Sequence, residues 1–439
     1  MFVFQNILWL LVLIGVMIII HEAGHFWAAR LFKVRVEVFS FGFGPRLFGF
    51  RRGDTDYRFS AILFGGYVKM TGEQPGDDNA DDPNSFLAKP RWQRLVIAFA
   101  GPFMNVVLAV GLLTGLFMVK YEKLAGTDQR AFIGYVFPDS AAAKAGIQEG
   151  DLVVRLDDRT NPTWEDIAMK EVSSAGRSMN VGVERNGKQI QTSVMPVLDD
   201  RSGVGSAGWA PKAEVQVGTL SPGMPAQKAG LEKGDLLISA NGEPIESMHT
   251  LQDIIQRGGA KPVTIVYLRN GQKHAVTVQP LFTKNDGPPR WIIGFLPERH
   301  LNLITTRLSL PEAFDESVRQ NVKGATMIFK FLGGIIERRM SPKSLEGPIR
   351  IAQISGEAAR EGPATFIMLM SMVSLNLAIF NLLPIPILDG GVIVLLLVEM
   401  LMRRDLSLPV KEAVFKVGFV FLMVVVAFVI YNDISKIVG

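Results

Sequence analysis

The chain has 439 residues, of which 48% are hydrophobic and 20% are charged, and its formal net charge is +4. This modest charge, without a basic stretch carrying interleaved aromatic residues, argues against nucleic acid as a partner. The lack of any cysteine excludes disulfides, thiolate metal ligands and a cysteine nucleophile. A mean hydropathy of +0.24 is high for a soluble protein, so the apolar residues must be concentrated in blocks.

These blocks are long enough to cross a bilayer, which takes about 20 mostly apolar residues. We therefore predict a polytopic α-helical membrane protein with four transmembrane helices, at residues 1–32, 94–119, 364–402 and 412–432. The first block lacks the basic start and the cleavage site of a signal peptide, which favours an uncleaved span.

Lysine and arginine near the ends of the spans indicate the orientation. Residues 30–94 and the link at 403–411 are rich in both, so we expect these segments to be cytoplasmic. The large region 120–363 and both termini should then face outward.

The outward region contains an internal repeat. The motif AGIQEGDLVVRLDD begins at Ala145, and the similar motif AGLEKGDLLISANG begins at Ala229. The same spacing, which we call the repeat spacing, separates ERNGKQ at Glu184 from LRNGQK at Leu268. Two matches at one spacing predict tandem units at 128–197 and 213–282. Their pattern resembles two α+β PDZ domains, which bind a peptide as an added strand at a sheet edge. Folded spacers that bind nothing are the alternative.

Two other segments flank the spans. Residues 33–93 are rich in strand-forming residues and glycine, which predicts membrane-associated β-hairpins that dip into the bilayer beside the site. An ordinary cytoplasmic sheet is equally consistent with this pattern. For residues 300–360 we predict an amphipathic helical segment that lies on the outward-facing surface of the membrane.

The first span ends on the motif HEAGH. Residues four apart lie on one helical face, so His21 and His25 can donate two imidazole nitrogens to one metal, with Glu22 beside them. His-Glu-x-x-His on a helix is the zinc metalloprotease pattern. Charged groups inside a span cost about 2.5–3.5 kcal/mol each on insertion scales, so a functional metal site explains this trio better than a helix end at the interface.

A catalytic zinc takes three protein ligands and leaves a fourth position for water. The remaining histidines lie in the outward region, and within the other spans, before Glu399 near a helix end, Asp389 is the one carboxylate. It follows a helix broken by Pro384 and Pro386, which could deliver it to the histidines. A cap for the resuming helix is the alternative role for Asp389.

The same span carries two asparagines, Asn376 and Asn381. They could hydrogen-bond the substrate backbone or a developing oxyanion, and they could equally satisfy the broken helix. The residues alone leave both roles open.

Five features together resemble the site-2 proteases, in particular the bacterial RseP type. They are HEAGH in the first span, FGGYVKM at 64–70, AGPFMN at 100–105, LDGG in the third span and the tandem PDZ pattern. The resemblance implies an intramembrane zinc metalloprotease in the inner membrane of a Gram-negative bacterium. Such enzymes cleave the membrane span of an anti-sigma factor in envelope stress signalling, and they also cleave remnant signal peptides. Membrane lipids surround the enzyme and are implied as further partners. Peptides or proteins would be the partners of the PDZ domains.

The resemblance also assigns residues. It implies that His21, His25 and Asp389 bind one Zn²⁺, with the site toward the cytoplasmic side, and that Glu22 is the catalytic carboxylate. The resemblance also matches substrate-handling positions in the Asn-x-x-Pro motif, Asn381 and Pro384, and in the membrane-dipping hairpins, Gly42, Gly44, Gly65, Gly66 and Tyr67. Asn376 is a further candidate for substrate binding because it is a polar residue of the same span.

Two other functions fit part of the pattern. A metal transporter should carry more intramembrane ligands or repeated broken spans, and neither is visible in the sequence. A peptide-binding scaffold with a structural zinc should offer four protein ligands, and three are found.

Overall fold

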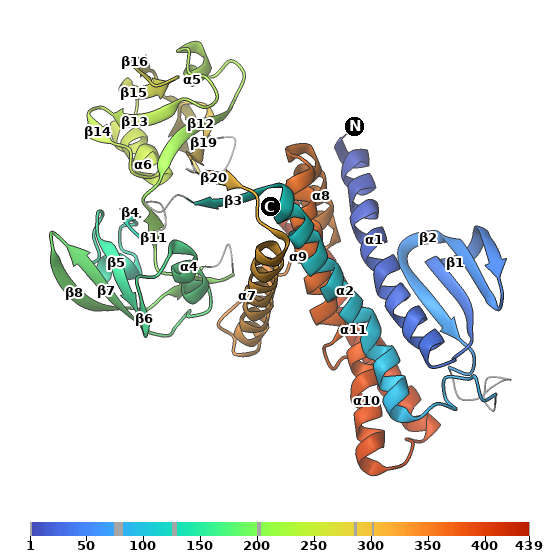
Figure 1. Cartoon of the computed structure of the whole chain (residues 1–439). Coiled ribbons are helices and arrows are strands. Elements are labelled where there is room, and N and C mark those ends of the chain that lie inside the picture. Colours follow the sequence, from blue (N-terminus) through green and yellow to red (C-terminus); the bar gives the residue numbers. More distant parts are fainter. Residues whose placement is uncertain are drawn as a thin grey trace. The chain divides into compact units, whose positions relative to one another are not determined.

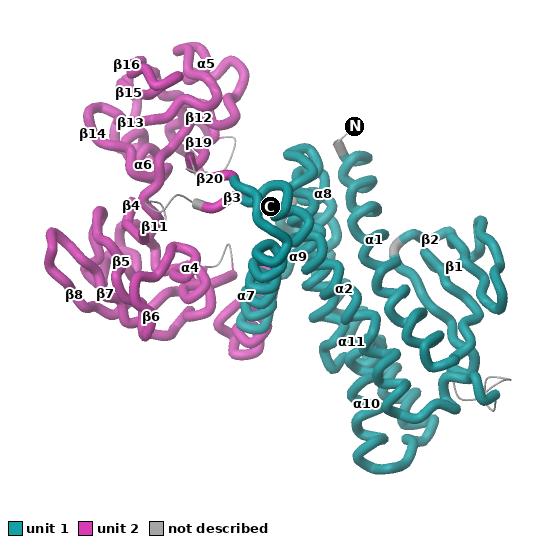
Figure 2. Tube along the Cα trace, in the orientation of Figure 1, with its two compact units in different colours: residues 1–121, 306–330, 345–439 teal, residues 122–305, 331–344 magenta. Residues whose placement is uncertain are grey.

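The computed structural model describes residues 2–73, 82–124, 130–199, 203–284, 288–300 and 303–438 (Figure 1). The chain divides into two compact units (Figure 2). The helical unit comprises Met1–Tyr121, Thr306–Lys330 and Leu345–Gly439, and the repeat unit comprises Glu122–Thr305 and Phe331–Ser344.

Seven long helices are described. They are α1 (Phe2–Leu31), α2 (Arg91–Val119), α7 (Leu310–Ile336), α8 (Pro348–Glu361), α9 (Pro363–Asn381), α10 (Asp389–Met402) and α11 (Leu408–Val438). Within the described residues, four helices are long and apolar enough to cross a membrane, namely α1, α2, α9 and α11. The predicted third span consists of α9 and α10, because the prolines after Asn381 interrupt the helical hydrogen bonds.

The helix α2 packs between α1 and α9 in the helical unit. The core shared by α1, α8 and α9 includes Leu13, Met17 and Phe366, and α2 meets α9 at Ala109 and Ile379. By contrast, 6% of the apolar window of α11 is buried within the protein. Three packed helices therefore form the scaffold, and most of α11 presents its apolar surface outward, as expected of a helix exposed to lipid.

The segment 33–93, which the sequence predicts to form β-hairpins, contains two long paired strands, β1 (Val36–Arg52) and β2 (Thr55–Met70). The first part of β1 pairs with residues 66–70 of β2 and also with residues 56–59, while residues 46–52 pair with 55–60. The strands thus bend into a four-segment sheet whose two edge segments are 66–70 and 46–52. The edge segment 66–70 packs on α1 through Val68 and Met70, and the adjacent Val36 joins them against Phe26.

The repeat unit contains two sets of elements in the same order. The first set is β4 (Ile133–Val136), α3 (Ala141–Lys144), β5 (Leu152–Leu156), β6 (Arg159–Thr160), α4 (Trp164–Val172), β7 (Met179–Arg185), β8 (Lys188–Val194), β9 (Val197–Leu198), β10 (Gly205–Ser206) and β11 (Trp209–Pro211). The second set is β12 (Glu214–Leu220), α5 (Pro225–Lys228), β13 (Leu236–Ala240), β14 (Glu243–Pro244), α6 (Met248–Gly258), β15 (Val263–Arg269), β16 (Gln272–Val278), β17 (Leu281–Thr283), β18 (Arg290–Ile292) and β19 (Phe295–His300). We call these sets the first repeat and the second repeat.

The repeat spacing recurs in the elements, since it also separates Leu152, the first residue of β5, from Leu236, the first residue of β13. Each repeat also uses a strand beyond the predicted boundaries of 197 and 282: β11 pairs with β4, and β19 pairs with β12. The predicted start at 128 lies outside the described residues. The pair β3 (Tyr121–Leu124) and β20 (Leu303–Thr306) flanks the repeats in the sequence.

A buried ion pair occurs at the same place in both repeats. Asp151 is fully buried and accepts hydrogen bonds from Arg185 at 2.6 and 2.7 Å and from the Gln148 backbone N–H at 2.9 Å. Asp235 and Arg269 repeat the arrangement at 2.7 Å. The carboxylate fixes the Gly-Asp turn to the hairpin that follows, so the motif shared by the two repeats is a structural one.

We predict that Asp151→Ala destabilises the first repeat by about 3 kcal/mol, because it removes the carboxylate that the Arg185 guanidinium and the turn amide require. Local hydrogen exchange of the full chain measures this free energy. The matched control is Asp253→Ala, which removes the exposed i,i+4 partner of Arg257 and should change stability by about 0.5 kcal/mol or less. Equal effects of both variants would contradict the structural role of the buried pair.

Candidate metal centre

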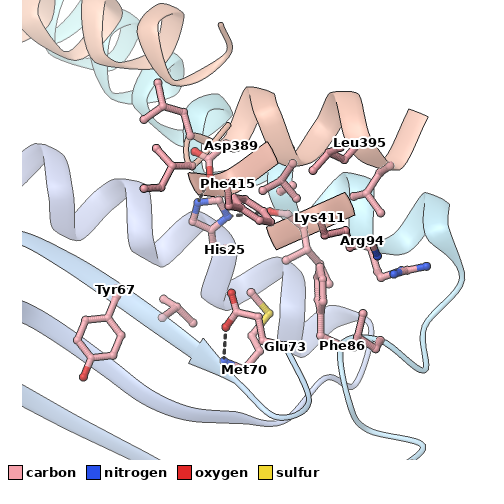
Figure 3. Close-up of a pocket in the computed structure, with 18 of the residues that line it drawn as sticks. His25, Tyr67, Met70, Glu73, Phe86, Arg94, Asp389, Leu395, Lys411 and Phe415 are labelled. Atoms are coloured by element: carbon pink, nitrogen blue, oxygen red, sulfur yellow. Dashed lines mark hydrogen bonds and ion pairs between the residues drawn. The ribbon is translucent and has the colours of Figure 1, made fainter. Parts of the chain in front are cut away.

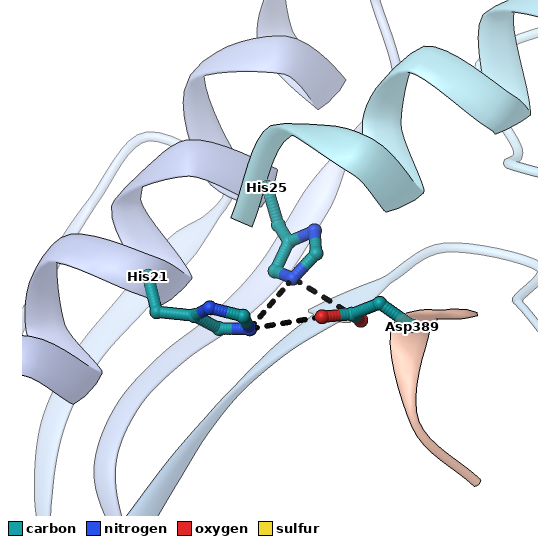
Figure 4. Close-up of side chains that lie close together, drawn as sticks. All are labelled: His21, His25 and Asp389. Carbon is teal, nitrogen blue, oxygen red and sulfur yellow. Dashed lines mark hydrogen bonds and ion pairs between the residues drawn. The ribbon is translucent and has the colours of Figure 1, made fainter. Parts of the chain in front are cut away.

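Two histidines of α1 and one aspartate of α10 converge inside the helical unit (Figure 4). His21 Nε2 lies 3.2 Å from His25 Nε2. Asp389 Oδ2 lies 3.1 Å from His21 Nε2, and Oδ1 lies 3.5 Å from His25 Nε2. Both histidines are buried, and 21% of the aspartate side chain is exposed. Side chains from near the two ends of the sequence therefore share one small polar site.

Asp389 reaches the histidines from the broken helix. The residue two positions earlier, Ile387, has a φ of 90°, a conformation that is strained for a β-branched side chain. The turn ends with Asp389 as the first residue of α10, and no side chain caps this helix. A Cβ on Gly390 would clash with the carbonyls of Leu382 and Leu383. The tight turn therefore directs the carboxylate toward α1 rather than toward its own helix.

The other ring nitrogen of each histidine has a defined partner. His25 Nδ1 lies 2.8 Å from the carbonyl oxygen of Ile97, which accepts its N–H and leaves the Nε2 lone pair toward Asp389. His21 Nδ1 lies 3.2 Å from the side-chain amide of Asn105. A half-turn of that amide lets Oδ1 accept the His21 N–H, and it satisfies an oxygen that is otherwise buried without a hydrogen-bond partner among the described residues.

The donor set fits a zinc ion. Two ligand nitrogens at 2.0–2.1 Å from one tetrahedral zinc lie about 3.3 Å apart, and the two Nε2 atoms are 3.2 Å apart. Two imidazoles and one carboxylate also form a known catalytic donor set, which leaves a fourth position open. His21, His25 and Asp389 are thus the residues that would hold the metal.

The approach of α2 to the histidines depends on a glycine. A Cβ on Gly101 would clash with the His25 imidazole. The motif AGPFMN therefore contacts both histidines. Gly101 leaves room for the His25 imidazole, and Asn105, one turn later, contacts His21.

A cavity of about 750 Å³ opens beside the three donor groups (Figure 3). Glu22 lines it, and a Cβ added at Gly66 would lie 3.3 Å from the Glu22 side chain, so the two residues adjoin. Gly66 and Tyr67 of the sheet edge line the same cavity. The cavity thus brings the carboxylate of the motif, the candidate ligands and an edge strand together.

The structure brings some of the predicted substrate residues to this cavity and leaves others apart. Asn381 Nδ2 lies 3.5 Å from His21 Nε2. Asn381 itself is absent from the described cavity lining, as are Asn376, Pro384, Gly42, Gly44 and Gly65. Gly42 and Gly44 have φ of 91° and 84° and form the bends of β1, while the Phe43 ring fills the space beside Gly65. The three glycines Gly42, Gly44 and Gly65 therefore contribute to the shape of the sheet.

Sequence reasoning missed several residues of the site. Asn105 stands in the motif AGPFMN, yet its contact with His21 depends on how α2 packs against α1. A charged cluster was missed too: at the cavity wall, Glu399 is 1% exposed and pairs with Lys411 at 2.6 Å and with Arg94 at 4.0 Å. The signal available in the sequence was a glutamate within an apolar run near the end of a span.

Comparison with known proteins is consistent with this geometry. The model of peptidase family M50 matches residues 9–425. Protease RseP of Yersinia pestis is 30% identical, and the match covers 98% of this chain and 100% of that protein. The regulator of sigma-E protease RseP of Salmonella typhimurium is 29% identical, with coverage of 98% and 99%. A solved PDZ domain of the SdrC-like protein of Listeria monocytogenes matches with a TM-score of 0.18 and 18% identity, and covers 19% of this chain and 87% of that domain.

The family match extends over nearly the whole chain. It confirms the resemblance drawn from the motifs, the enzyme class and zinc as the cofactor. The chain therefore belongs to peptidase family M50, the site-2 proteases, and is a zinc metalloprotease and multi-pass membrane protein.

Proposed function

We propose that the protein cleaves the transmembrane segments of single-span membrane proteins, with His21, His25 and Asp389 as zinc ligands and Glu22 as the catalytic carboxylate. The observation that carries the proposal is the convergence of these four side chains at one cavity between apolar helices. Inside a span, unsatisfied charges are costly, so a cluster of this composition indicates a functional site.

The chemistry follows from the residues. A zinc ion bound there supplies Lewis-acid polarisation of the scissile carbonyl and lowers the pKa of water. Glu22 takes the proton of the attacking water and passes it to the leaving amine. Asn381, beside His21, donates a hydrogen bond to the substrate carbonyl as charge develops on its oxygen.

A substrate helix must unwind before it can be cut, because its amides are hidden in its own hydrogen bonds. Residues 66–70 form one edge of the sheet, and Gly66 and Tyr67 line the cavity. The edge accepts the unwound segment as an added strand. A peptide bond of the added segment would then lie beside Glu22, because Gly66 of this edge adjoins the Glu22 side chain.

The substrates and the setting are proposed from the relatives and the charge pattern. Two relatives are named as RseP, one of them a regulator of sigma-E protease. By this similarity, the substrates are an anti-sigma factor in envelope stress signalling and remnant signal peptides. The basic segments 30–94 and 403–411 face the cytoplasm of a Gram-negative bacterium. Both termini and the two repeats face the periplasm, and the site lies toward the cytoplasmic side.

The two repeats are tandem PDZ domains in this proposal. Their support is the ordered recurrence of strands and helices at the repeat spacing, together with edge strands β11 and β19, each at the end of its pairing. They bind peptides or protein tails and exclude substrates that still carry a bulky outer domain.

We predict that Glu22→Gln lowers cleavage of a single-span model peptide by about 10²–10⁴-fold, the range for loss of a general acid–base, while zinc content stays at one per chain. Metal analysis and a peptide-cleavage assay measure both quantities. The matched control is Glu73→Gln, which neutralises another carboxylate of the same cavity and should leave the rate near that of the wild type. Full activity of Glu22→Gln would refute the assigned role.

A second prediction concerns the partner of His21. Asn105→Ala should weaken zinc affinity by about 10–100-fold, because the amide orients the imidazole. Competition with a chelator measures the affinity, and added zinc should restore cleavage. The control Ser374→Ala removes a 2.9 Å hydrogen bond to the Asn105 backbone carbonyl and leaves the side-chain amide intact, so its zinc affinity should not change. If both variants lose zinc equally, the amide has no specific role.

The size filter is tested by replacing Glu122–Thr305 with a flexible linker. We expect the shortened enzyme to cut a substrate with an intact outer domain as fast as the trimmed substrate, because the barrier to entry is gone. The two rates are compared by gel assay in proteoliposomes. A shortened enzyme that cuts the trimmed substrate but still rejects the intact one would show that selectivity resides elsewhere.

A further inference from the structure

The first repeat carries a loop suited to bind a terminal carboxylate. Backbone N–H groups before an edge strand can capture the C-terminal carboxylate of a peptide that is added to that strand. In the first repeat, the loop Ser206–Gly208 precedes the edge strand β11. Its carbonyls are fixed by the body of the repeat, since Ala207 O accepts from Ala142 N–H at 2.8 Å and Gly208 O from Phe137 N–H at 2.9 Å.

The same loop exists in the second repeat. Ile293 O accepts from Ala226 N–H at 2.8 Å, and Gly294 O accepts from Ser221 N–H at 2.9 Å. These two donors lie one repeat spacing after Ala142 and Phe137, so Ile293 corresponds to Ala207. The two loops therefore have equivalent anchors and precede equivalent strands.

In the first repeat, the protein's own carboxylate occupies this loop. Glu171, in the last turn of α4, accepts the Ala207 backbone N–H with one oxygen and the Trp209 indole N–H with the other, the latter at 3.0 Å. These two donors come from the loop and from the first residue of β11. Burial raises the pKa of Glu171 above its usual value, which indicates that the carboxylate is withdrawn from water.

A second contact joins α4 to β11, through an aromatic residue of each. The rings of Trp164 and Trp209 meet edge to face, with centroids 6.3 Å apart. Trp164 is the first residue of α4, and its indole N–H donates to the carbonyl of Phe132 at 2.9 Å. Both ends of α4 therefore contact Trp209, so an added strand would have to displace side chains from this edge.

The second repeat has no such carboxylate at this position. The residue one repeat spacing after Glu171 is Ile255, which is buried in the apolar core. The one acidic residue of α6, Asp253, pairs with Arg257 at 2.8 Å. Gln256, a neutral amide, exchanges hydrogen bonds of 2.7 and 3.0 Å with the backbone of Trp291, two residues before Ile293.

We propose that Glu171 is an internal ligand that holds the carboxylate-binding loop of the first repeat closed, while the loop at Ile293 in the second repeat is open to peptides with a free C-terminus. The inference rests on the proposed assignment of the repeats as PDZ domains and specifies the ligand class of each. The first repeat then binds such a peptide after Glu171 is displaced, and the two repeats differ in affinity although they share a fold.

The experiment uses the full chain in detergent, with Glu22→Gln in every sample to prevent cleavage of the probe. The probe is a fluorescein-labelled decapeptide pool with a free C-terminus and the last four residues randomised among apolar types. Its amidated twin is the ligand control. We expect one peptide-binding site per chain with Glu171 present and two sites with Glu171→Gln. The first repeat of the Glu171→Gln variant should bind the probe at least tenfold more tightly than the first repeat with Glu171 present. The amidated twin should not bind.

Hydrogen exchange localises the sites to 205–211 and 291–297, and thermal melting checks the fold of each variant. The matched protein control is Glu165→Gln, an exposed acid on the same helix, which should keep one site. Two sites with Glu171 present, or one site in folded Glu171→Gln, would overturn the internal-ligand role alone. No binding by any variant would overturn the peptide-binding function of the repeats as well.

Discussion

The structure depends on the burial of a polar cluster among apolar helices. His21, His25 and Asp389 are held within hydrogen-bonding distance of one another, and both imidazoles are buried. A carboxylate and two imidazoles are costly in such a setting unless a cation or protons offset the charge. The break between α9 and α10, the strained Ile387 and the carbonyl of Ile97 all serve to bring these groups together.

The helices around this cluster can approach closely because the residues at the crossings are small. Gly101 leaves room for the His25 ring, and Gly390 for the carbonyls of the preceding turn. Small residues at helix crossings are the means by which membrane helices pack without a hydrophobic driving force between them. The same packing presents Asn105 to His21, so the geometry around the two histidines and the association of the helices have one structural cause.

The two repeats share one order of elements but differ beside the loop that precedes the edge strand. The buried pairs Asp151–Arg185 and Asp235–Arg269 are equivalent and maintain the common architecture. The difference lies at one position of the second helix of each repeat, where Glu171 is replaced by Ile255. The Glu171 carboxylate accepts the Ala207 N–H and the Trp209 indole N–H, whereas Ile255 joins the apolar core of the second repeat.

The sequence by itself determined the spans, the two histidines on one helical face and the tandem repeat, because each is a matter of local periodicity or of matching motifs. It also indicated Asp389, since a lone carboxylate in an apolar span is conspicuous. Only the tertiary structure decided the contact of Asn105 with His21, the pairing of Glu399 with Lys411 and the capture of Ala207 by Glu171. These contacts join residues from different elements, and their geometry depends on helix crossings and strand register that no local pattern encodes.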